Sequence, residues 1–121
     1  MSTCLIVDDN ASFLDAATTL LEREGLDVVG VASTSAAALE QAEQLRPEIV
    51  LVDIMLGAES GFDLARGLTT AFPDMTVILV STHSEADFAD LIEETPAAGF
   101  VPKSRLSASA IRKLASAHRD R

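Results

Sequence analysis

The sequence predicts a single α/β domain in which a five-stranded parallel sheet is covered by helices on both faces. Five short apolar segments alternate with segments whose apolar residues recur at helical spacing, an order typical of a parallel sheet. Two of the apolar segments, residues 49–52 and 76–80, are uninterrupted and rich in β-branched residues, which indicates strands buried on both faces. The predicted domain covers residues 1–121.

Residues 3–8 predict the first strand, and Asn10 is a suitable N-cap for the helix that follows. The apolar residues of this helix recur at spacings of three and four: Phe13, Ala16, Ala17, Leu20 and Leu21. Gly25 supplies the left-handed conformation that ends a helix. The second strand, residues 26–31, alternates in polarity and is interrupted by Gly30, which suits the edge of a sheet.

The second helix begins at residues 33–35, Ser-Thr-Ser, and Pro47 ends it because the residue before a proline avoids the helical conformation. Its inner face is expected to carry Ala38, Leu39, Ala42 and Leu45. The third strand, residues 49–53, ends in Asp53, and Gly57 and Gly61 then frame a loop. The apolar residues of the third helix are Phe62, Ala65, Leu68 and Phe72.

The second half of the chain continues the same alternation. Residues 76–80 predict the fourth strand, and Ser84 to Asp87 have the spacing of a capping box, which indicates a short fourth helix. Residues 99–102 predict a brief fifth strand that runs into Lys103. Ser107 caps the last helix, whose apolar side carries Leu106, Ala110, Ile111 and Leu114.

Composition narrows the possible classes of function. The single cysteine, Cys4, excludes an intramolecular disulfide and a cysteine-based metal site. The net charge of −10 argues against nucleic acid as a partner of this chain, although the last helix is basic. The sequence has neither a secretory leader nor an apolar run long enough to span a bilayer, so we expect a cytoplasmic protein with no membrane partner.

Polar residues stand where four of the five predicted strands end. Parallel strands joined by right-handed crossovers end at the same edge of a sheet, so these residues should converge on one cleft. They are carboxylates, hydroxyls and an ammonium: Asp8 and Asp9, Asp53, Ser81 and Thr82, and Lys103. Three close carboxylates repel one another unless a cation lies between them, and ligation by oxygen alone favours Mg²⁺.

A Mg²⁺ ion beside a lysine and a hydroxyl is suited to binding a phosphoryl group, because the two cations neutralise its oxygens and the hydroxyl donates to one of them. The available nucleophile is a carboxylate, so the covalent product would be an aspartyl phosphate. Asp53 is a better candidate than Asp8 or Asp9 because it stands alone at its strand end. The simpler alternative is that Asp53 starts a turn or caps the next helix.

Four motifs, taken in order, resemble the receiver domain of two-component response regulators over essentially the whole chain. They are Leu-Ile-Val-Asp-Asp at residues 5–9, Arg-Pro-Glu-Ile-Val-Leu-Val-Asp at 46–53, Leu-Val-Ser-Thr at 79–82 and Gly-Phe-Val-Pro-Lys at 99–103. The resemblance implies a doubly wound, flavodoxin-like sheet with the strand order 2-1-3-4-5. It also implies that Asp53 accepts a phosphoryl group from a phosphohistidine on a sensor histidine kinase or phosphotransfer protein.

The resemblance also implies a metal site. Asp8 and Asp9 would hold Mg²⁺ together with the carboxylate of Asp53 and the backbone carbonyl of Met55. The sequence departs from the family just after these residues, because Gly57 stands where many members have a proline. The shape of the loop after Asp53 is therefore not fixed by the resemblance.

Further residues would bind the phosphoryl group and respond to it. Lys103 and Thr82 would contact the phosphate, Ser81 would move to hydrogen-bond it, and Phe100 would swing into the space that Ser81 leaves. Tyrosine is also common at the position of Phe100. Ser104 follows the lysine where the family often has a proline, which leaves the shape of this second loop open.

Three rival functions can be weighed against the residues. An aspartyl-nucleophile phosphatase carries Asp-x-Asp after its first strand, whereas Asp8 and Asp9 are adjacent. A flavodoxin-like cofactor binder would place these two acids against the flavin phosphate. A receiver-shaped module that is never phosphorylated would not need every site residue. We therefore expect a phosphoacceptor that assists its own phosphotransfer and dephosphorylation, and not a turnover enzyme.

The chain ends within its last helix, so we expect a readout through protein binding and no contact with DNA in this chain. The binding face would combine the helix that starts at Ser84, the strand 99–102 and the last helix. Its charged residues are acidic in the first of these and basic in the last: Glu85, Asp87, Asp90, Glu93 and Glu94 against Arg112, Lys113 and Arg119. Such a face suits a partner protein or a homodimer. The alternative is the receiver part of a longer regulator with a helix-turn-helix domain.

Overall fold

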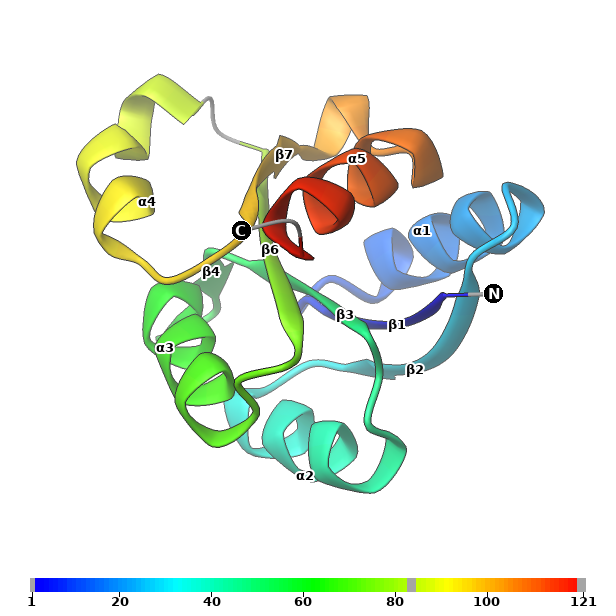
Figure 1. Cartoon of the computed structure of the whole chain (residues 1–121), viewed down its shortest axis with the longest axis horizontal. Helices are drawn as coiled ribbons and strands as arrows, with labels where there is room; N and C mark the ends of the chain where they lie inside the picture. The colour runs from blue at the N-terminus through cyan, green and yellow to red at the C-terminus, as the bar shows by residue number, and fades with distance from the viewer. Residues whose placement is uncertain (1, 83–84, 120–121) are drawn as a thin grey trace.

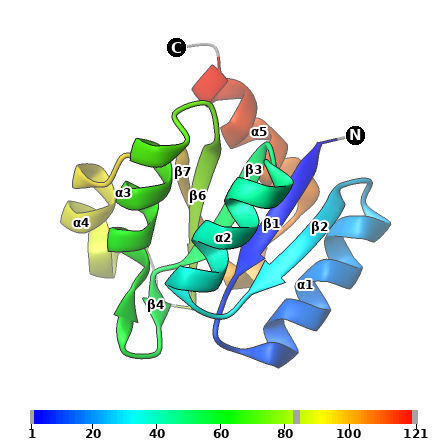
Figure 2. The ribbon, with the colours of Figure 1, turned by 90° about the horizontal axis from the view of Figure 1, so that it is seen from below.

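Five parallel strands form the centre of the protein, as Figures 1 and 2 show. The computed structural model describes residues 2–82 and 85–119. The order along the sheet is β2-β1-β3-β6-β7, which confirms the expected doubly wound, flavodoxin-like arrangement. The strands are β1 (Thr3–Val7), β2 (Asp27–Ala32), β3 (Ile49–Asp53), β6 (Thr76–Ser81) and β7 (Gly99–Pro102). Each pair of neighbours is parallel, so the carboxyl ends share one edge.

Helices cover both faces of this sheet (Figures 1 and 2). Helices α1 (Ala11–Arg23) and α5 (Ala108–Arg119) lie on one face, and α2 (Ser35–Leu45), α3 (Gly61–Ala71) and α4 (Ala89–Glu94) lie on the other. Strand β3 is buried throughout: Val50 and Val52 point to the core under α2 and α3, and Ile49 and Leu51 point to the core under α1 and α5. None of the described helices is long and apolar enough to cross a membrane.

Three of the described helices begin at caps that the sequence predicts, whereas the cap of α3, Ser60, was not predicted. The side chains of Asn10, Thr34 and Ser107 each accept a hydrogen bond from the backbone N–H three residues later, at 3.2, 3.1 and 3.0 Å. The N-cap predicted at Ser84 lies outside the described residues. Helix α2 ends before Pro47, and the intervening Arg46 takes a left-handed conformation with φ of +46°.

Strand β2 lies at the edge of the sheet, as its interrupted pattern predicts. The carbonyl of Ala32 faces β1 and accepts from the backbone N–H of Asp8 at 3.0 Å, whereas the carbonyl of Val31 accepts from Nε2 of Gln41 in α2 at 2.7 Å. Gly30 makes room for this amide, because a Cβ at residue 30 would lie 2.4 Å from Gln41 Oε1. The side chain of Gln41 therefore covers part of the open strand edge.

Two helices bury narrower faces than predicted. The buried residues of α1 are Leu14, Ala17 and Leu21. Ala16, one residue from Ala17 and therefore turned by about 100°, is exposed. Ala38 and Ala42 of α2 are buried, but Leu39 and Leu45 are 37% and 42% exposed. Small side chains let α2 approach the sheet along one narrow line, and the two leucines lie beside that line.

The loop predicted between Gly57 and Gly61 is instead a short hairpin. Strands β4 (Met55–Leu56) and β5 (Glu59–Ser60) pair in antiparallel fashion around a turn in which Gly57 has φ of +59°. Glu59 Oε1 accepts a hydrogen bond from the backbone N–H of Ser35 at 3.0 Å, so the hairpin is joined to the start of α2. Two 3₁₀ turns were also not predicted: Glu85–Phe88 before α4 and Lys103–Arg105 after β7.

The first residue of α3 lies against the backbone of β3 and tolerates no side chain. A Cβ at Gly61 would lie 2.0 Å from the carbonyl oxygen of Asp53, a backbone atom that cannot move aside. We expect Gly61→Ala to lower the free energy of unfolding by about 3 kcal/mol or more. Gly67→Ala, in the same helix with nothing within 4 Å of its Cβ position, is the matched control and should raise it by up to about 1 kcal/mol. Urea unfolding measures both, and equal effects would contradict the prediction.

Candidate functional site

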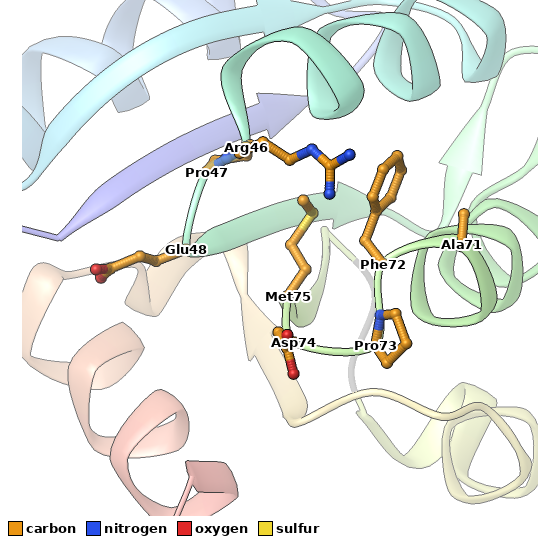
Figure 3. Close-up of a pocket in the computed structure, with 8 residues that line it drawn as sticks. All are labelled: Arg46, Pro47, Glu48, Ala71, Phe72, Pro73, Asp74 and Met75. Carbon is orange, nitrogen blue, oxygen red and sulfur yellow. The ribbon is translucent and has the colours of Figure 1, made fainter.

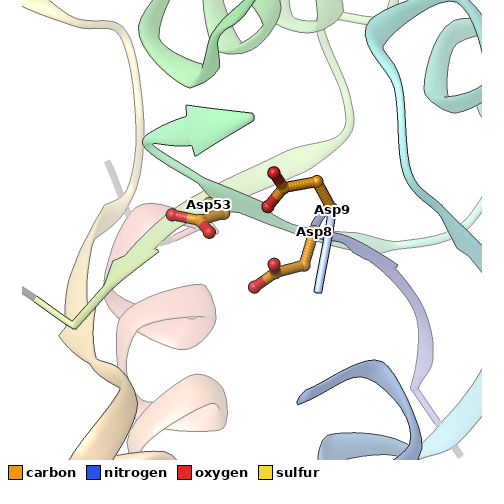
Figure 4. Close-up of side chains that lie close together, drawn as sticks. All are labelled: Asp8, Asp9 and Asp53. Atoms are coloured by element: carbon orange, nitrogen blue, oxygen red, sulfur yellow. The ribbon is translucent and has the colours of Figure 1, made fainter. Parts of the chain in front are cut away.

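Three carboxylates lie close together at the carboxyl-end edge of the sheet (Figure 4). Asp8 and Asp9 follow β1, and Asp53 is the last residue of β3. Val7 of β1 pairs with Val52 of β3, so the parallel register places Asp8 and Asp53 side by side. One oxygen from each of the three residues lies within 4.8 Å of the others. The structure thus brings together the acidic residues that the sequence singled out.

Backbone N–H groups hold the two buried carboxylates. Asp8 is fully buried, and its Oδ1 accepts from the backbone N–H of Asn10 at 2.9 Å. Asp53 is 6% exposed, and its Oδ1 accepts from the backbone N–H of Met55 at 3.1 Å. Asp9 is exposed. Each buried carboxylate therefore uses one oxygen for the backbone and has its Oδ2 atom left for other contacts.

An ammonium group lies between the two buried carboxylates. Lys103 Nζ is 2.5 Å from Asp8 Oδ2, and it donates a hydrogen bond to Asp53 Oδ2 at 3.1 Å. The contact with Asp8 is an ion pair without the geometry of a hydrogen bond, and Asp8 Oδ2 has no hydrogen-bond partner among the described residues. The lysine side chain is 13% exposed, and its ammonium lies 4.2 Å from the centre of the Phe13 ring.

Burial and pairing act in opposite directions on the two partners. Burial raises the pKa of the Asp53 carboxyl, and the Met55 N–H and Lys103 only partly counteract it. Burial by itself lowers the pKa of Lys103, but its contacts with Asp8 and Asp53 outweigh that effect, so the pKa is raised. The ammonium therefore stays charged at neutral pH, while the ionised form of Asp53 would gain from a further cation.

The donor atoms of this site suit a hard divalent cation. The three carboxylates and one ammonium leave a net charge of −2, and the buried Asp8 Oδ2 lacks a hydrogen bond within the described part of the chain. Among residues 2–82 and 85–119, the group of possible ligands consists of aspartates, and it includes neither the imidazole nor the thiolate ligands that zinc prefers. Oxygen-only ligation with excess negative charge fits Mg²⁺.

The predicted switch residues lie on the strands next to this site. Ser81 is the buried last residue of β6, one position beyond Val80, which pairs with Asp53. Thr82 follows it and is exposed. Phe100 of β7 is half-buried and packs against the core under α2 and α3. Their contacts with a phosphoryl group stay predictions, as does the role of the Met55 carbonyl.

Two further residues make contacts at this edge that were not predicted from the sequence. Phe13 was predicted only as an apolar helix residue, but α1 begins so soon after Asp9 that the first turn of the helix stands beside Lys103. Gly57 brings the hairpin close to Asp9, since a Cβ at residue 57 would lie 3.4 Å from Asp9 Oδ2. Neither contact has a pattern along the chain from which it could be found.

A separate cavity lies at the opposite end of the sheet (Figure 3). Its volume is about 330 Å³, and its lining comes from residues 46–48 and 71–75, which precede β3 and β6. The guanidinium carbon of Arg46 lies 5.0 Å from the centre of the Phe72 ring. None of the predicted site residues lines this cavity, so the carboxylate edge is the candidate functional site.

The chain matches a protein family over most of its length. The family model of the response regulator receiver domain matches residues 4–115. Response regulator GacA of Pseudomonas viridiflava is 32% identical over 104 residues, which cover 85% of this chain and 49% of GacA. Transcriptional regulatory protein LnrK of Bacillus subtilis is 29% identical over 120 residues, covering 98% of this chain and 54% of LnrK. The chain therefore spans about half the length of the curated relatives it matches.

Solved structures share the fold over nearly the whole chain. The signal receiver domain of the putative response regulator NarL from Mycobacterium tuberculosis has a TM-score of 0.84 and 25% identity, covering 99% of this chain and 98% of that one. A response regulator from Burkholderia pseudomallei, solved with a phosphorylated aspartic acid, a calcium ion and citrate, has a TM-score of 0.81 and 25% identity. That match covers 99% of this chain and 72% of the other.

Removing the charge of Asp53 should stabilise the metal-free protein. Because its pKa is raised in the folded state, the ionised carboxylate costs stability once the pH rises through that pKa. We expect Asp53→Asn to add about 1 kcal/mol at pH 7, or roughly 4 °C in Tm, and little at pH 3, where the wild-type carboxyl is protonated. Thermal unfolding in EDTA at both pH values measures this. An Asn variant with the same advantage at both pH values would show that the charge is not the cause.

Proposed function

The chain belongs to the response regulator receiver domain family, and we propose that it is a phosphorylation-dependent signalling switch with Asp53 as its phosphoacceptor. The observation that carries the proposal is the pairing of buried Asp53 with Lys103 beside Asp8 and Asp9. A nucleophilic oxygen, an ammonium for the phosphate and oxygen ligands for a divalent cation thus belong to one site. This combination is what the formation of an aspartyl phosphate needs.

Phosphoryl transfer uses the groups gathered at this edge. A carboxylate oxygen of Asp53 attacks the phosphorus of a phosphohistidine on a sensor kinase or phosphotransfer protein. The O–P bond forms, the N–P bond breaks, and the imidazole leaves. Lys103 Nζ, 3.1 Å from Asp53 Oδ2, is close enough to bind an oxygen of the transferred group. Mg²⁺ held by Asp8, Asp9, Asp53 and the Met55 carbonyl would neutralise charge on the phosphoryl oxygens.

The choice of a divalent cation has two supports. In this chain, the buried Asp8 Oδ2 atom and the net charge of −2 leave a place for positive charge that Lys103 alone does not fill. In the structural relative from Burkholderia pseudomallei, a calcium ion and a phosphorylated aspartic acid are present together. Calcium and magnesium are both hard cations that take oxygen ligands.

The phosphoryl group changes the protein through the two strands beside Asp53. Ser81 moves toward the phosphate, Thr82 and Lys103 bind it, and Phe100 turns into the space that Ser81 leaves. Two placements support this sequence of events. Ser81 ends the strand that pairs with β3, and Phe100 lies on β7, where it pairs with Leu79 of β6. Ser81 and Phe100 therefore lie on neighbouring strands, so a displacement of Ser81 can affect Phe100 directly.

The output face combines α4, β7 and α5. A cavity of about 260 Å³ between β7 and α5 is lined in part by Phe100 and Lys113, so a movement of Phe100 would change its shape. Exposed acidic residues lie on α4 and the turn before it: Asp87, Asp90, Glu93 and Glu94. Lys113 is the exposed basic residue of α5 on this face, whereas Arg112, predicted to lie beside it, turns toward α1 and donates to the backbone carbonyl of Glu24 at 3.1 Å. Opposite charges on two sides of one face suit a second copy in antiparallel register or a partner with matching charges.

Intact-mass measurement after incubation with acetyl phosphate and Mg²⁺ tests the phosphoacceptor. We expect the mass of one phosphoryl group to be added to the wild type and to Asp63→Asn, an exposed aspartate outside the site, and not to Asp53→Asn. EDTA should abolish the gain. No gain in the wild type, in a protein shown to bind Mg²⁺, would favour a receiver-shaped module that works without phosphorylation.

Sedimentation of the phosphorylated protein tests the output face as a homodimer contact. We expect phosphorylation to increase the dimer fraction and Lys113→Glu to weaken the dimer about tenfold, because it places like charges together. Adding Asp90→Lys should restore the dimer by exchanging the charges. Arg66→Glu on α3 removes another exposed cation and serves as the control. A phosphorylated protein that stays monomeric would rule out the homodimer.

A further inference from the structure

The ring of Phe13 makes a direct contact with the lysine of the site. Lys103 Nζ lies 4.2 Å from the centre of this ring, well within the 6 Å or so at which an aromatic face attracts a cation. The lysine side chain is only 13% exposed, and Phe13 is half-buried. Exclusion of water strengthens such a contact, since the ammonium has few water molecules to replace the ring.

Phe13 also belongs to a group of four residues in which each contacts the next and the last contacts Asp8 of the candidate metal site. The backbone N–H of Asn10 donates to Asp8 Oδ1 at 2.9 Å, and Asn10 Oδ1 accepts from the backbone N–H of Phe13 at 3.2 Å. The Phe13 ring contacts the Lys103 ammonium, which in turn pairs with Asp8 Oδ2. The N-cap that starts α1 therefore fixes the place of the ring relative to Asp8.

The three partners of the ammonium respond differently to a bound cation. A divalent cation on the carboxylates competes for the charge of Asp8 and Asp53, and it also repels the ammonium of Lys103. The phenyl ring is neutral and is no ligand for a hard cation, so its attraction for the ammonium does not depend on the metal. When a divalent cation is bound, the contact with the Phe13 ring is therefore the one of the three that keeps its strength.

We propose that Phe13 is a positioning residue that keeps the Lys103 ammonium beside Asp53 when a divalent cation occupies the carboxylates. This inference rests on the proposed phosphoacceptor function, because the held ammonium is then ready for an oxygen of the incoming phosphoryl group. Without the ring, the lysine side chain leaves the site for solvent when the cation enters. Phe13 acts through Lys103 and touches neither the nucleophile nor the metal ligands in any contact described above.

Three phenylalanine variants separate this role from simple packing. Phe13→Leu removes the aromatic face and keeps an apolar side chain, whereas Phe13→Tyr keeps the face. Phe72→Leu is the matched control, because Phe72 is also half-buried and also lies against a cation, Arg46, but at the opposite end of the sheet. Thermal unfolding verifies that all three variants fold.

The first measurement reports the contact itself. A proton above an aromatic face has its NMR resonance moved upfield by the ring current, so the ε-methylene protons of Lys103 should show this shift with and without Mg²⁺. We expect Phe13→Leu to abolish the shift, and Phe13→Tyr and Phe72→Leu to retain it. A Lys103 shift that is the same in Phe13→Leu as in the wild type, or that disappears from the wild type when Mg²⁺ is added, would overturn the proposal.

The second measurement is the rate of phosphorylation by acetyl phosphate at saturating Mg²⁺. We expect Phe13→Leu to slow it about tenfold and the other two variants to change it by less than about twofold. In a Lys103→Met background, Phe13→Leu should have no further effect, because the residue through which it acts is gone. An equal slowing in both backgrounds would show that Phe13 acts by another route. If the wild type is not phosphorylated at all, the proposed function fails, and the NMR shift still decides the positioning role.

Discussion

The ammonium group among three carboxylates is the interaction on which the site depends. Parallel pairing of β1 and β3 places Asp8 and Asp53 at the same edge, where their charges repel. Lys103 lies within ion-pair distance of both and offsets part of that repulsion. Burial, together with the negative charge of Asp8, makes an ionised Asp53 costly, and the negative charge that remains unbalanced makes the site attractive to cations. The same buried carboxylates therefore affect both the stability of the metal-free protein and the affinity of the site for a metal ion.

The groups that hold charge and the groups proposed to respond to it stand on elements that differ in packing. Strand β3 lies at the centre of the sheet with all five residues buried, and Gly61 brings α3 directly against its end. Strand β7 is an edge strand, and α4 has no fully buried residue. Asp53 on β3 therefore stays in place, whereas a structural change transmitted to β7 and α4 displaces fewer packed side chains.

The strands could be predicted because a parallel strand buried on both faces leaves a continuous apolar run such as 49–52. Their order was implied by the resemblance to receiver domains. The meeting of Asp53 with Lys103 followed from the shared edge of parallel strands. The buried side of α1 was harder to predict, because Ala16 and Ala17 are equally apolar and are separated by a single residue step along the helix. The hairpin after Asp53 was not predicted, because a glycine such as Gly57 suits an irregular loop as well as a tight turn. The contact of Phe13 with the lysine depends on side-chain directions that a pattern along the chain does not record.

The amide of Gln41 over the carbonyl of Val31 has a consequence for how copies of this protein meet. An open strand edge pairs with almost any other strand, since backbone hydrogen bonds carry no information about side chains. Here an outward carbonyl of β2 is already occupied, and Gly30 is the residue that lets the amide reach it. The β2 edge therefore offers one acceptor fewer to a strand of another copy. An acceptor that is satisfied within one molecule favours contacts between molecules through side chains, whose arrangement of charge distinguishes one partner from another.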